Sequence, residues 1–152
     1  MNENPAQIFL AELSRQIGIE NLAYNEDSVC CLEVGDRLAV QIEWEPVSGF
    51  LVFLSRVGSS PSSGREEFFR ALLEANFLFH GTAGETLCLD PESGDVMLCR
   101  TFPLATTAVA TLLGEFTYFL ETTDTWADRV ENGLPGPTEE SGPSPSTLQF
   151  RA

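Results

Sequence analysis

The residues of this sequence that most readily bind metals or act as nucleophiles are four cysteines and one histidine. Cys30 and Cys31 are adjacent and would point to opposite faces of a strand, and neither Cys88 nor Cys99 belongs to a CxxC pair. His80 has no serine or aspartate context that would indicate a catalytic triad. Because a zinc site needs clustered ligands of these types, we expect no metal, no cofactor and no catalytic residue. The thiols are predicted to be free and buried, as in a reducing compartment.

Two short segments are similar to ligand-binding loops but lack the residues that such loops need. Residues 81–84 carry two glycines, yet they follow a predicted helix instead of opening one and include no phosphate-binding lysine. Residues 92–95 have too few spaced carboxylates for calcium, so we expect a hairpin turn there. An enzyme built on a small acidic substrate-binding domain is an alternative that the single histidine disfavours.

Negative charge is the strongest feature of the composition. The chain has 23 acidic residues and eight basic ones, all of them arginine, which gives a net charge of −15. Nucleic acids and anionic membranes bind through basic patches, so we expect neither as a partner. The charge can serve solubility alone or attract a basic or mixed-charge partner. The first residues show no signal-peptide pattern and no apolar run is long enough to cross a bilayer, which predicts a cytoplasmic protein.

Hydrophobic periodicity predicts an α+β domain, residues 1–130, with an antiparallel sheet of about five strands and three helices in the order α-β-β-β-α-β-β-α. One predicted strand, 50–57, is apolar on both faces, so it is either buried on both or exposes one to a partner. Proline and glycine become frequent afterwards, which predicts a disordered tail over 131–152. The predicted helices are 5–17, 65–79 and 106–130, and the predicted strands are 29–34, 38–44, 50–57, 85–89 and 96–102.

The predicted helix 65–79 has more apolar surface than one core contact requires. Its apolar side chains cover roughly half of the circumference, whereas a single contact needs a stripe of about 100°. Such a helix needs a second partner, which predicts a dimer. Asn76 interrupts this arc, and its amide is expected either to hydrogen-bond the following hairpin or a dimer mate, or to lie at the wet edge of the stripe. The arc comprises Phe68, Phe69, Leu72, Leu73, Ala75, Phe77 and Phe79.

A series of short motifs runs from the end of this helix through the following hairpin. It comprises Leu72, Leu73, Ala75, Asn76, Leu78 and Phe79, a glycine-bearing break, Leu87, Cys88, Leu89 and Asp90, then Ser93, Gly94, Val96 and Leu98, and finally Phe102, Pro103 and Leu104. The series, together with the acidic charge, the length and the element order, resembles the class I chaperones of bacterial type III secretion, the Tir chaperone (CesT-like) family. The resemblance extends over residues 6–125.

This resemblance implies a homodimer without enzymatic activity. Such proteins bind the N-terminal region of a secreted effector, hold it extended and assist its delivery, with the secretion ATPase as a further expected partner. The dimer interface would involve Phe69, Leu72, Leu73, Asn76, Phe77 and Phe79. The effector-binding candidates on the first helix and on the strands are Ile8, Phe9, Leu10, Leu13, Leu38, Val40, Ile42, Phe50 and Val52.

Two questions stay open at the level of sequence. A regulatory binding module of the same fold, which sequesters another regulator or chaperone, is the main alternative to an escort of secreted proteins. The sequence also leaves open which face of the sheet is uncovered. The proline-rich segment 131–152 departs from the compact family pattern, so the resemblance assigns it no role.

Overall fold

The computed structural model describes residues 4–134 and 149–152. Its elements follow the predicted order, with a short 3-10 helix (η1) after the second helix and a sixth strand near the end of the chain. They are α1 (Pro5–Ile17), β1 (Val29–Val34), β2 (Leu38–Glu45), β3 (Phe50–Ser59), α2 (Arg65–Asn76), η1 (Phe77–Phe79), β4 (Thr86–Leu89), β5 (Asp95–Pro103), α3 (Val109–Glu131) and β6 (Phe150–Arg151).

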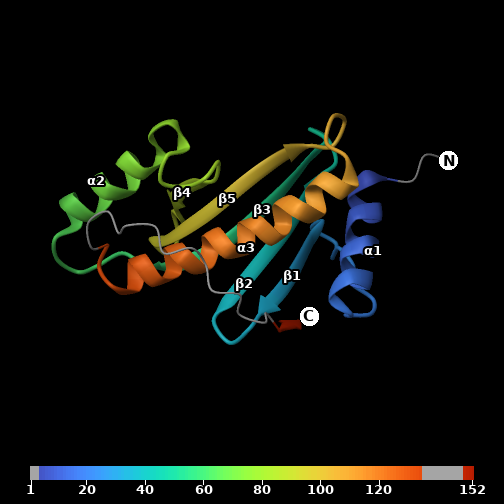
Figure 1. Ribbon diagram of the computed structural model, residues 1–152, viewed down its shortest axis with the longest axis horizontal. Helices are drawn as coiled ribbons and strands as arrows, with labels where there is room; N and C mark the ends of the chain where they lie inside the picture. The colour runs from blue at the N-terminus through green and yellow to red at the C-terminus, as the bar shows by residue number, and fades with distance from the viewer. Residues whose placement is uncertain (1–3, 135–148) are drawn as a thin grey trace.

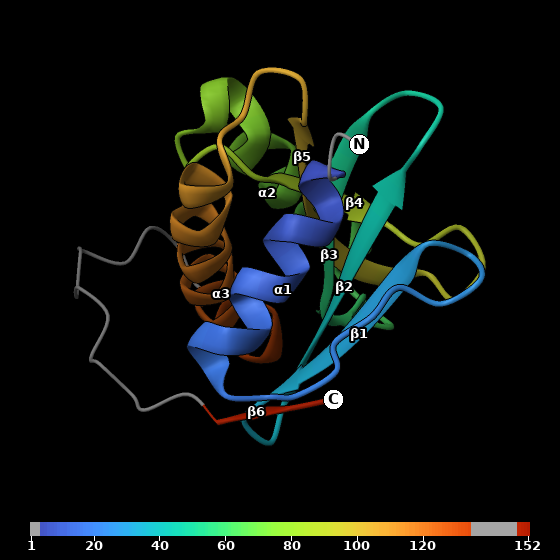
Figure 2. The same cartoon turned by 90° about the vertical axis from the view of Figure 1, so that its right-hand side faces the viewer.

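The strands form one antiparallel sheet in the order β4-β5-β3-β2-β1-β6. The long helix α3 runs across this sheet, and α1 lies beside it on the same side of the sheet (Figure 1, Figure 2). The fold is therefore an α+β arrangement with an antiparallel sheet, as predicted, and α1 and α3 cover one face of that sheet.

The core lies between this sheet face and the two helices. Strand residues alternate between faces, and register places Ile42 of β2 opposite Phe53 of β3, so both point towards the helices. The ring of Phe53 meets that of Phe9 from α1 at 5.7 Å and that of Phe116 from α3 at 5.2 Å between centroids. Aromatic pairs at these distances add favourable contacts beyond the area that they bury.

Local signals determine where α1 begins and ends. The Asn4 side chain accepts a hydrogen bond from the Ala6 N–H at 3.0 Å, and Pro5 occupies the first helical position. Gly18 ends the helix at φ 71°, a left-handed conformation that glycine adopts without steric cost. Both ends of α1 agree with the prediction.

The structure corrects the predicted helix 65–79 at its C-terminal end. The α-helix stops at Asn76, and Leu78 has φ 50° and ψ 25°, which no regular right-handed helix contains. The Gly81 N–H donates to the Ala75 carbonyl at 3.0 Å and closes the helix end. The prediction continued the helix because the apolar side chains carry no signal for this break.

Two further boundaries differ from the prediction. The third helix begins at Val109 instead of residue 106, because the N–H groups of Thr106 and Thr107 donate to the Pro103 carbonyl in a turn. The predicted disordered segment 131–152 includes the last residue of α3 and the two-residue strand β6, while residues 135–148 lie outside the described residues. Strand β6 also makes the sheet one strand wider than the expected five.

Candidate binding surfaces

The most exposed apolar surface of the described chain lies on α2 and η1. Leu73 and Phe77 are each 70% exposed, Leu78 is 69% exposed and Phe79 is 52% exposed. These four residues and the half-buried Phe69 are called the α2 patch below. Isolated exposed apolar residues are ordinary, but a contiguous group of this size indicates an interaction surface.

The patch is exposed because α2 contacts the rest of the domain through a narrow stripe only. Phe68 and Leu72 are buried, whereas Leu73 and Phe77 project from the side that faces away. An open depression of about 620 Å³ runs along this side, lined by Glu66, Phe69, Arg70, Leu73, Glu74 and Phe77. The apolar excess of the helix is thus directed into solvent in the single chain.

Asn76 attaches the end of α2 to the hairpin. Its Nδ2 donates to the Leu87 carbonyl at 3.0 Å, and its Oδ1 accepts from the Leu87 N–H at 2.9 Å. Leu87 is paired with Leu98 of β5, so the amide occupies the outer edge of β4 as a further strand residue would. Of the alternatives that the sequence left open, the hydrogen bond to the hairpin is present.

A buried acidic group lies beneath the loop that follows η1. Glu85 is fully buried, with Oε2 3.6 Å from Arg100 Nη1, and neither carboxylate oxygen has a hydrogen-bond partner among the described residues. Arg100 also approaches Glu115 at 3.3 Å. Burial raises the pKa of Glu85 to about 7, against the opposing effect of the Arg100 charge. No sequence pattern indicated this group, because residue 85 was predicted only as the first residue of a strand.

The predicted partner-binding residues divide into accessible ones and buried ones. Phe50 is exposed at the start of β3, and Val52 and Ile8 are half-buried, so these three are accessible to a partner. The other six belong to the core between sheet and helices, where a partner has no access to them without opening the domain. They are Phe9, Leu10, Leu13, Leu38, Val40 and Ile42.

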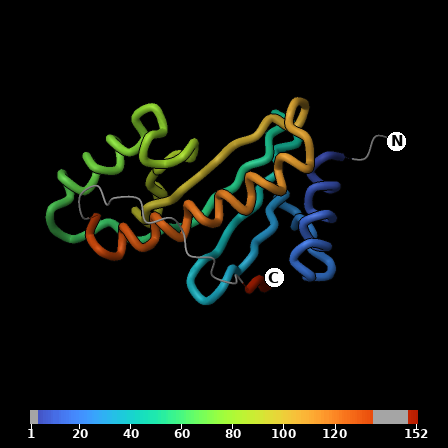
Figure 3. The backbone as a smooth tube through the Cα atoms, in the orientation of Figure 1, coloured from blue at the N-terminus to red at the C-terminus, as the bar shows by residue number. Residues whose placement is uncertain are grey.

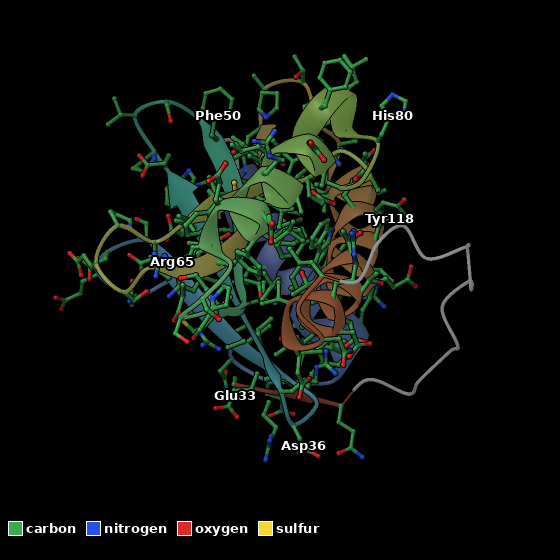
Figure 4. The ribbon with its side chains drawn as sticks, turned by 90° about the vertical axis from the view of Figure 1, so that its left-hand side faces the viewer. Glu33, Asp36, Phe50, Arg65, His80 and Tyr118 are labelled. Carbon is green, nitrogen blue, oxygen red and sulfur yellow. The ribbon has the colours of Figure 1, made fainter. Side chains whose placement is uncertain are left out.

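For the strand residues, the pairing register explains which side chains are accessible and which are buried. Val52 lies opposite Glu43 of β2 and opposite Thr101 of β5, so Phe50 and Val52 share the sheet face that no described helix covers. Leu54 follows on the same face and is half-buried. The alternation of 50, 52 and 54 in the sequence was the signal that could have added Leu54 to the prediction. Figure 4 shows Phe50 at one end of the molecule, away from Glu33 and Asp36.

The thiols differ from their predicted burial. Cys30 is buried, Cys31 is exposed, and Cys88 and Cys99 are half-buried on neighbouring strands of the hairpin. All four are free. Burial, and then the neighbouring Cys88 thiol, raises the pKa of Cys99 to about 11, so this thiol is protonated at neutral pH.

Two further properties concern the described residues, 4–134 and 149–152. Within them, no three histidine, cysteine, aspartate or glutamate side chains gather in a way that could hold a metal ion. None of the helices in this part of the chain is sufficiently long and apolar to span a membrane.

The fold and the surfaces together define a small α+β binding domain with an apolar helix face and an uncovered sheet face. A model of the Tir chaperone protein (CesT) family matches residues 8–127. The chain belongs to this family, as the sequence motifs suggested. No curated protein sequence matches it.

Solved structures of type III secretion proteins share the fold. The chain is similar to a chain of the ExsC–ExsE complex, with a TM-score of 0.70, 19% identity and coverage of 82% of this chain and 93% of that one. It is similar to a chain of the HopA1–SchA chaperone–effector complex, with a TM-score of 0.66, 20% identity and coverage of 80% and 92%. It is also similar to a chain of the complex between the Yersinia pestis type III secretion chaperone SycH and a fragment of YscM2, with a TM-score of 0.61, 16% identity and coverage of 80% and 98%.

Proposed function

We propose that this protein is a homodimeric cytoplasmic chaperone of type III secretion that binds the N-terminal segment of a secreted effector and holds it extended. Membership of the Tir chaperone family carries this proposal. It is supported by the similarity to chains of the HopA1–SchA, ExsC–ExsE and SycH–YscM2 complexes. No enzymatic activity is assigned to it. Delivery of the bound effector to the secretion ATPase is the expected next step.

The α2 patch supports the homodimer. Leu73 and Phe77 are each 70% exposed on one side of a helix whose other side is already attached to the domain. Fully burying a large apolar side chain contributes about 1.5–3 kcal/mol, before the costs of association are subtracted. A second copy of the same helix provides a matching apolar surface, whereas the net charge of −15 makes other parts of two copies repel one another.

The uncovered sheet face supports capture of a polypeptide. Val52 and Leu54 form an apolar row at the centre of this face, beside Glu43 and Glu45 on the same side of β2. An extended peptide with alternating apolar side chains can bury them on such a row, and the flanking carboxylates favour basic residues in the partner. Phe50 extends the row at one end.

Sedimentation equilibrium of the purified chain tests the dimer. The native protein is expected at twice 16.6 kDa, and Leu73→Asp is expected at 16.6 kDa with an unchanged circular dichroism spectrum, because Leu73 lies outside the core. Val47→Asp is the matched control, since Val47 is 99% exposed in the β2–β3 turn, and it should leave the dimer intact. A native protein that stays monomeric at micromolar concentration contradicts the homodimer.

Affinity capture in the source bacterium, followed by mass spectrometry, tests partner binding. The native chain and Val47→Asp should retain a secreted protein whose isolated N-terminal segment is sufficient for binding, and Val52→Asp should retain less of it. Recovery of another chaperone or of a regulator instead favours the sequestering module of the same fold. Recovery of nucleic acid alone contradicts both functions.

A further inference from the structure

The chain places its own C-terminal segment on one edge of its sheet. Strand β1 would be an edge strand, but β6 pairs with it through Glu33↔Arg151 and Val34↔Phe150. The Gly35 N–H also donates to the Gln149 carbonyl. Figure 2 shows this short strand beside β1, at the margin of the sheet. Residues 149–151 thus cover main-chain groups at the outer edge of β1.

The side chains of β6 fit their surroundings in two ways. Phe150 is half-buried and packs against the apolar core. The Arg151 guanidinium donates to the Gly35 carbonyl at 3.2 Å and lies 3.6 Å from Glu33 and 3.5 Å from Asp36. Glu33 and Asp36 lie at the same end of the molecule in Figure 4. The edge therefore accepts an aromatic residue followed by a cation, in an extended main chain.

Strand β6 covers only part of the β1 edge. Strand β1 has six residues, and β6 pairs with only two of them. The N–H of Val29 and that of Gly35 both point to the outer edge of β1, where they donate to Asn25 Oδ1 and to the Gln149 carbonyl. Alternate residues of a strand direct their main-chain groups to the same edge, so the N–H and carbonyl of Cys31 also point to the outer edge of β1. No described strand pairs with Cys31 on that edge.

The ion pairs of β6 are also weak. Arg151 is largely exposed, and ion pairs between exposed groups contribute little because water and salt screen them. A longer strand that paired with Cys31 as well as Glu33 and Gly35 would make more main-chain hydrogen bonds on the same edge. The occupant of β1 is therefore displaceable by an extended polypeptide of similar chemistry.

We propose that β6 is a built-in competitor for the β1 edge, which a partner segment displaces when it adds its own strand there. The partner segment would carry an apolar residue followed by arginine or lysine, in the positions of Phe150 and Arg151. This proposal rests on the proposed function for the identity of the partner, but not for the docking of β6 itself. A tethered segment competes at an effective concentration in the millimolar range, so it sets a threshold of affinity for incoming segments.

The docking of β6 is tested without any partner, by amide hydrogen exchange on the full chain followed by NMR. The double variant Phe150→Asp/Arg151→Glu should leave β6 undocked and accelerate exchange at the N–H groups of Glu33 and Gly35 at least tenfold. Exchange at Ile42, in the centre of the sheet, is the internal control and should not change. Equal exchange at Gly35 in the native chain and the double variant overturns the proposal.

Competition is tested with a labelled peptide that has the sequence of residues 146–152. If β6 is docked about nine-tenths of the time, removing it should tighten binding of the peptide to the chain roughly tenfold. The same peptide with aspartate in place of Phe150 should bind neither chain. Identical affinity of the native chain and the double variant overturns the proposal, as does peptide affinity that depends on chain concentration, since β6 would then dock onto a second copy.

Binding of a captured effector segment distinguishes this proposal from the proposed function. A captured effector segment should bind the double variant about tenfold more tightly than the native chain. If the exchange and peptide experiments give the expected results but no secreted protein is captured, competition of β6 for the β1 edge is confirmed and the proposed function is contradicted. An effector segment that binds both chains equally tightly overturns the competition.

Discussion

Helices α1 and α2 have almost the same length and a similar amphipathic pattern, yet they use their apolar residues differently. α1 has 13 residues and buries four of them, whereas α2 has 12 residues and buries two. The two helices lie at opposite ends of the molecule, α1 beside α3 and the sheet, α2 beside the short strand β4 (Figure 3). The difference arises from the number of neighbours that each end of the domain offers.

The apolar side chains of α1 are buried within the chain, whereas those of α2 are partly left for a second contact. Phe9 of α1 lies between Phe53 and Phe116, so its apolar surface is used within the chain. Leu73 and Phe77 of α2 have no such neighbours in the described chain and remain 70% exposed. An amphipathic helix with a wide apolar arc therefore indicates both an attachment to its own domain and a second contact elsewhere.

The largest expected difference between the two helices is in the stability of the fold. Phe9→Ala should lower the free energy of unfolding by about 3–5 kcal/mol, because it removes a buried ring and leaves a cavity between Phe53 and Phe116. Leu73→Ala should change the stability of the monomer by about 0.5 kcal/mol or less, since its side chain is mostly in water. Urea titrations followed by tryptophan fluorescence measure both values.

Protein concentration separates the two effects in the same titrations. The loss in Phe9→Ala should be independent of concentration, while any loss in Leu73→Ala should grow with it, because it concerns association. Phe9→Leu provides a folded variant, with an expected loss of about 1.5 kcal/mol or less, in case Phe9→Ala does not fold. Equal, concentration-independent losses at both helices would contradict the comparison.

The sequence predicted α1 well because its signals are local. Asn4 and Pro5 mark its start, Gly18 marks its end, and the glycine-rich turns between the strands are equally local. The end of α2 coincides instead with hydrogen bonds between Asn76 and Leu87, a residue of another element. The sequence predicted this contact as one alternative for Asn76, but it did not predict that the helix ends there. The strand boundaries were predicted to within two residues for the same reason that α1 was, since alternation and turn residues lie inside each segment.

The candidate site was harder to predict than the fold. Leu38, Val40 and Ile42 alternate as regularly as Phe50 and Val52 do, so periodicity identified both rows as sheet faces. Only the pairing of Val52 with Glu43 shows that the two rows lie on opposite faces. Which face the helices cover is a property of the tertiary arrangement, and a single sequence does not contain it in any local form.

The buried Glu85, just before β4, should give the second-largest effect, and this effect should depend on pH. The folded-state pKa of Glu85 is about 7, above its ordinary value of 4.5, because the carboxyl is buried. Below pH 4.5 both states are protonated, and between pH 4.5 and 7 the unfolded chain loses the proton that the folded chain keeps. Stability should therefore fall across this range by up to about 3 kcal/mol, from 1.36 kcal/mol per pKa unit.

Urea titrations of the native chain and of Glu85→Gln, from pH 4.5 to pH 7.5, measure this contribution. The stability of the variant should fall much less over this pH range, because its amide does not titrate. Glu92→Gln, in the exposed turn of the β4–β5 hairpin, is the matched control and should keep the native slope. An unchanged slope in Glu85→Gln would show that other groups cause the pH dependence.

The smallest expected effect concerns the hydrogen bonds by which Asn76 attaches the end of α2 to β4. Asn76→Ala leaves the N–H and the carbonyl of Leu87 without their partner, at a cost of about 2 kcal/mol. Amide hydrogen exchange should accelerate at Leu87 and along α2 but not along α1, whose attachment consists of buried apolar side chains such as Phe9 and Leu13.

Controls for this variant distinguish the hydrogen bonds from helix propensity. Glu74→Ala is two residues away and exposed, so it should leave exchange at Leu87 unchanged. Asn76→Asp keeps the acceptor for the Leu87 N–H but turns the donor towards the Leu87 carbonyl into a second acceptor, so it should behave like Asn76→Ala. If exchange in Asn76→Ala rises equally in α1 and α2, the two ends of the domain open together, and the distinction between a self-contained helix and a helix that needs a partner is lost.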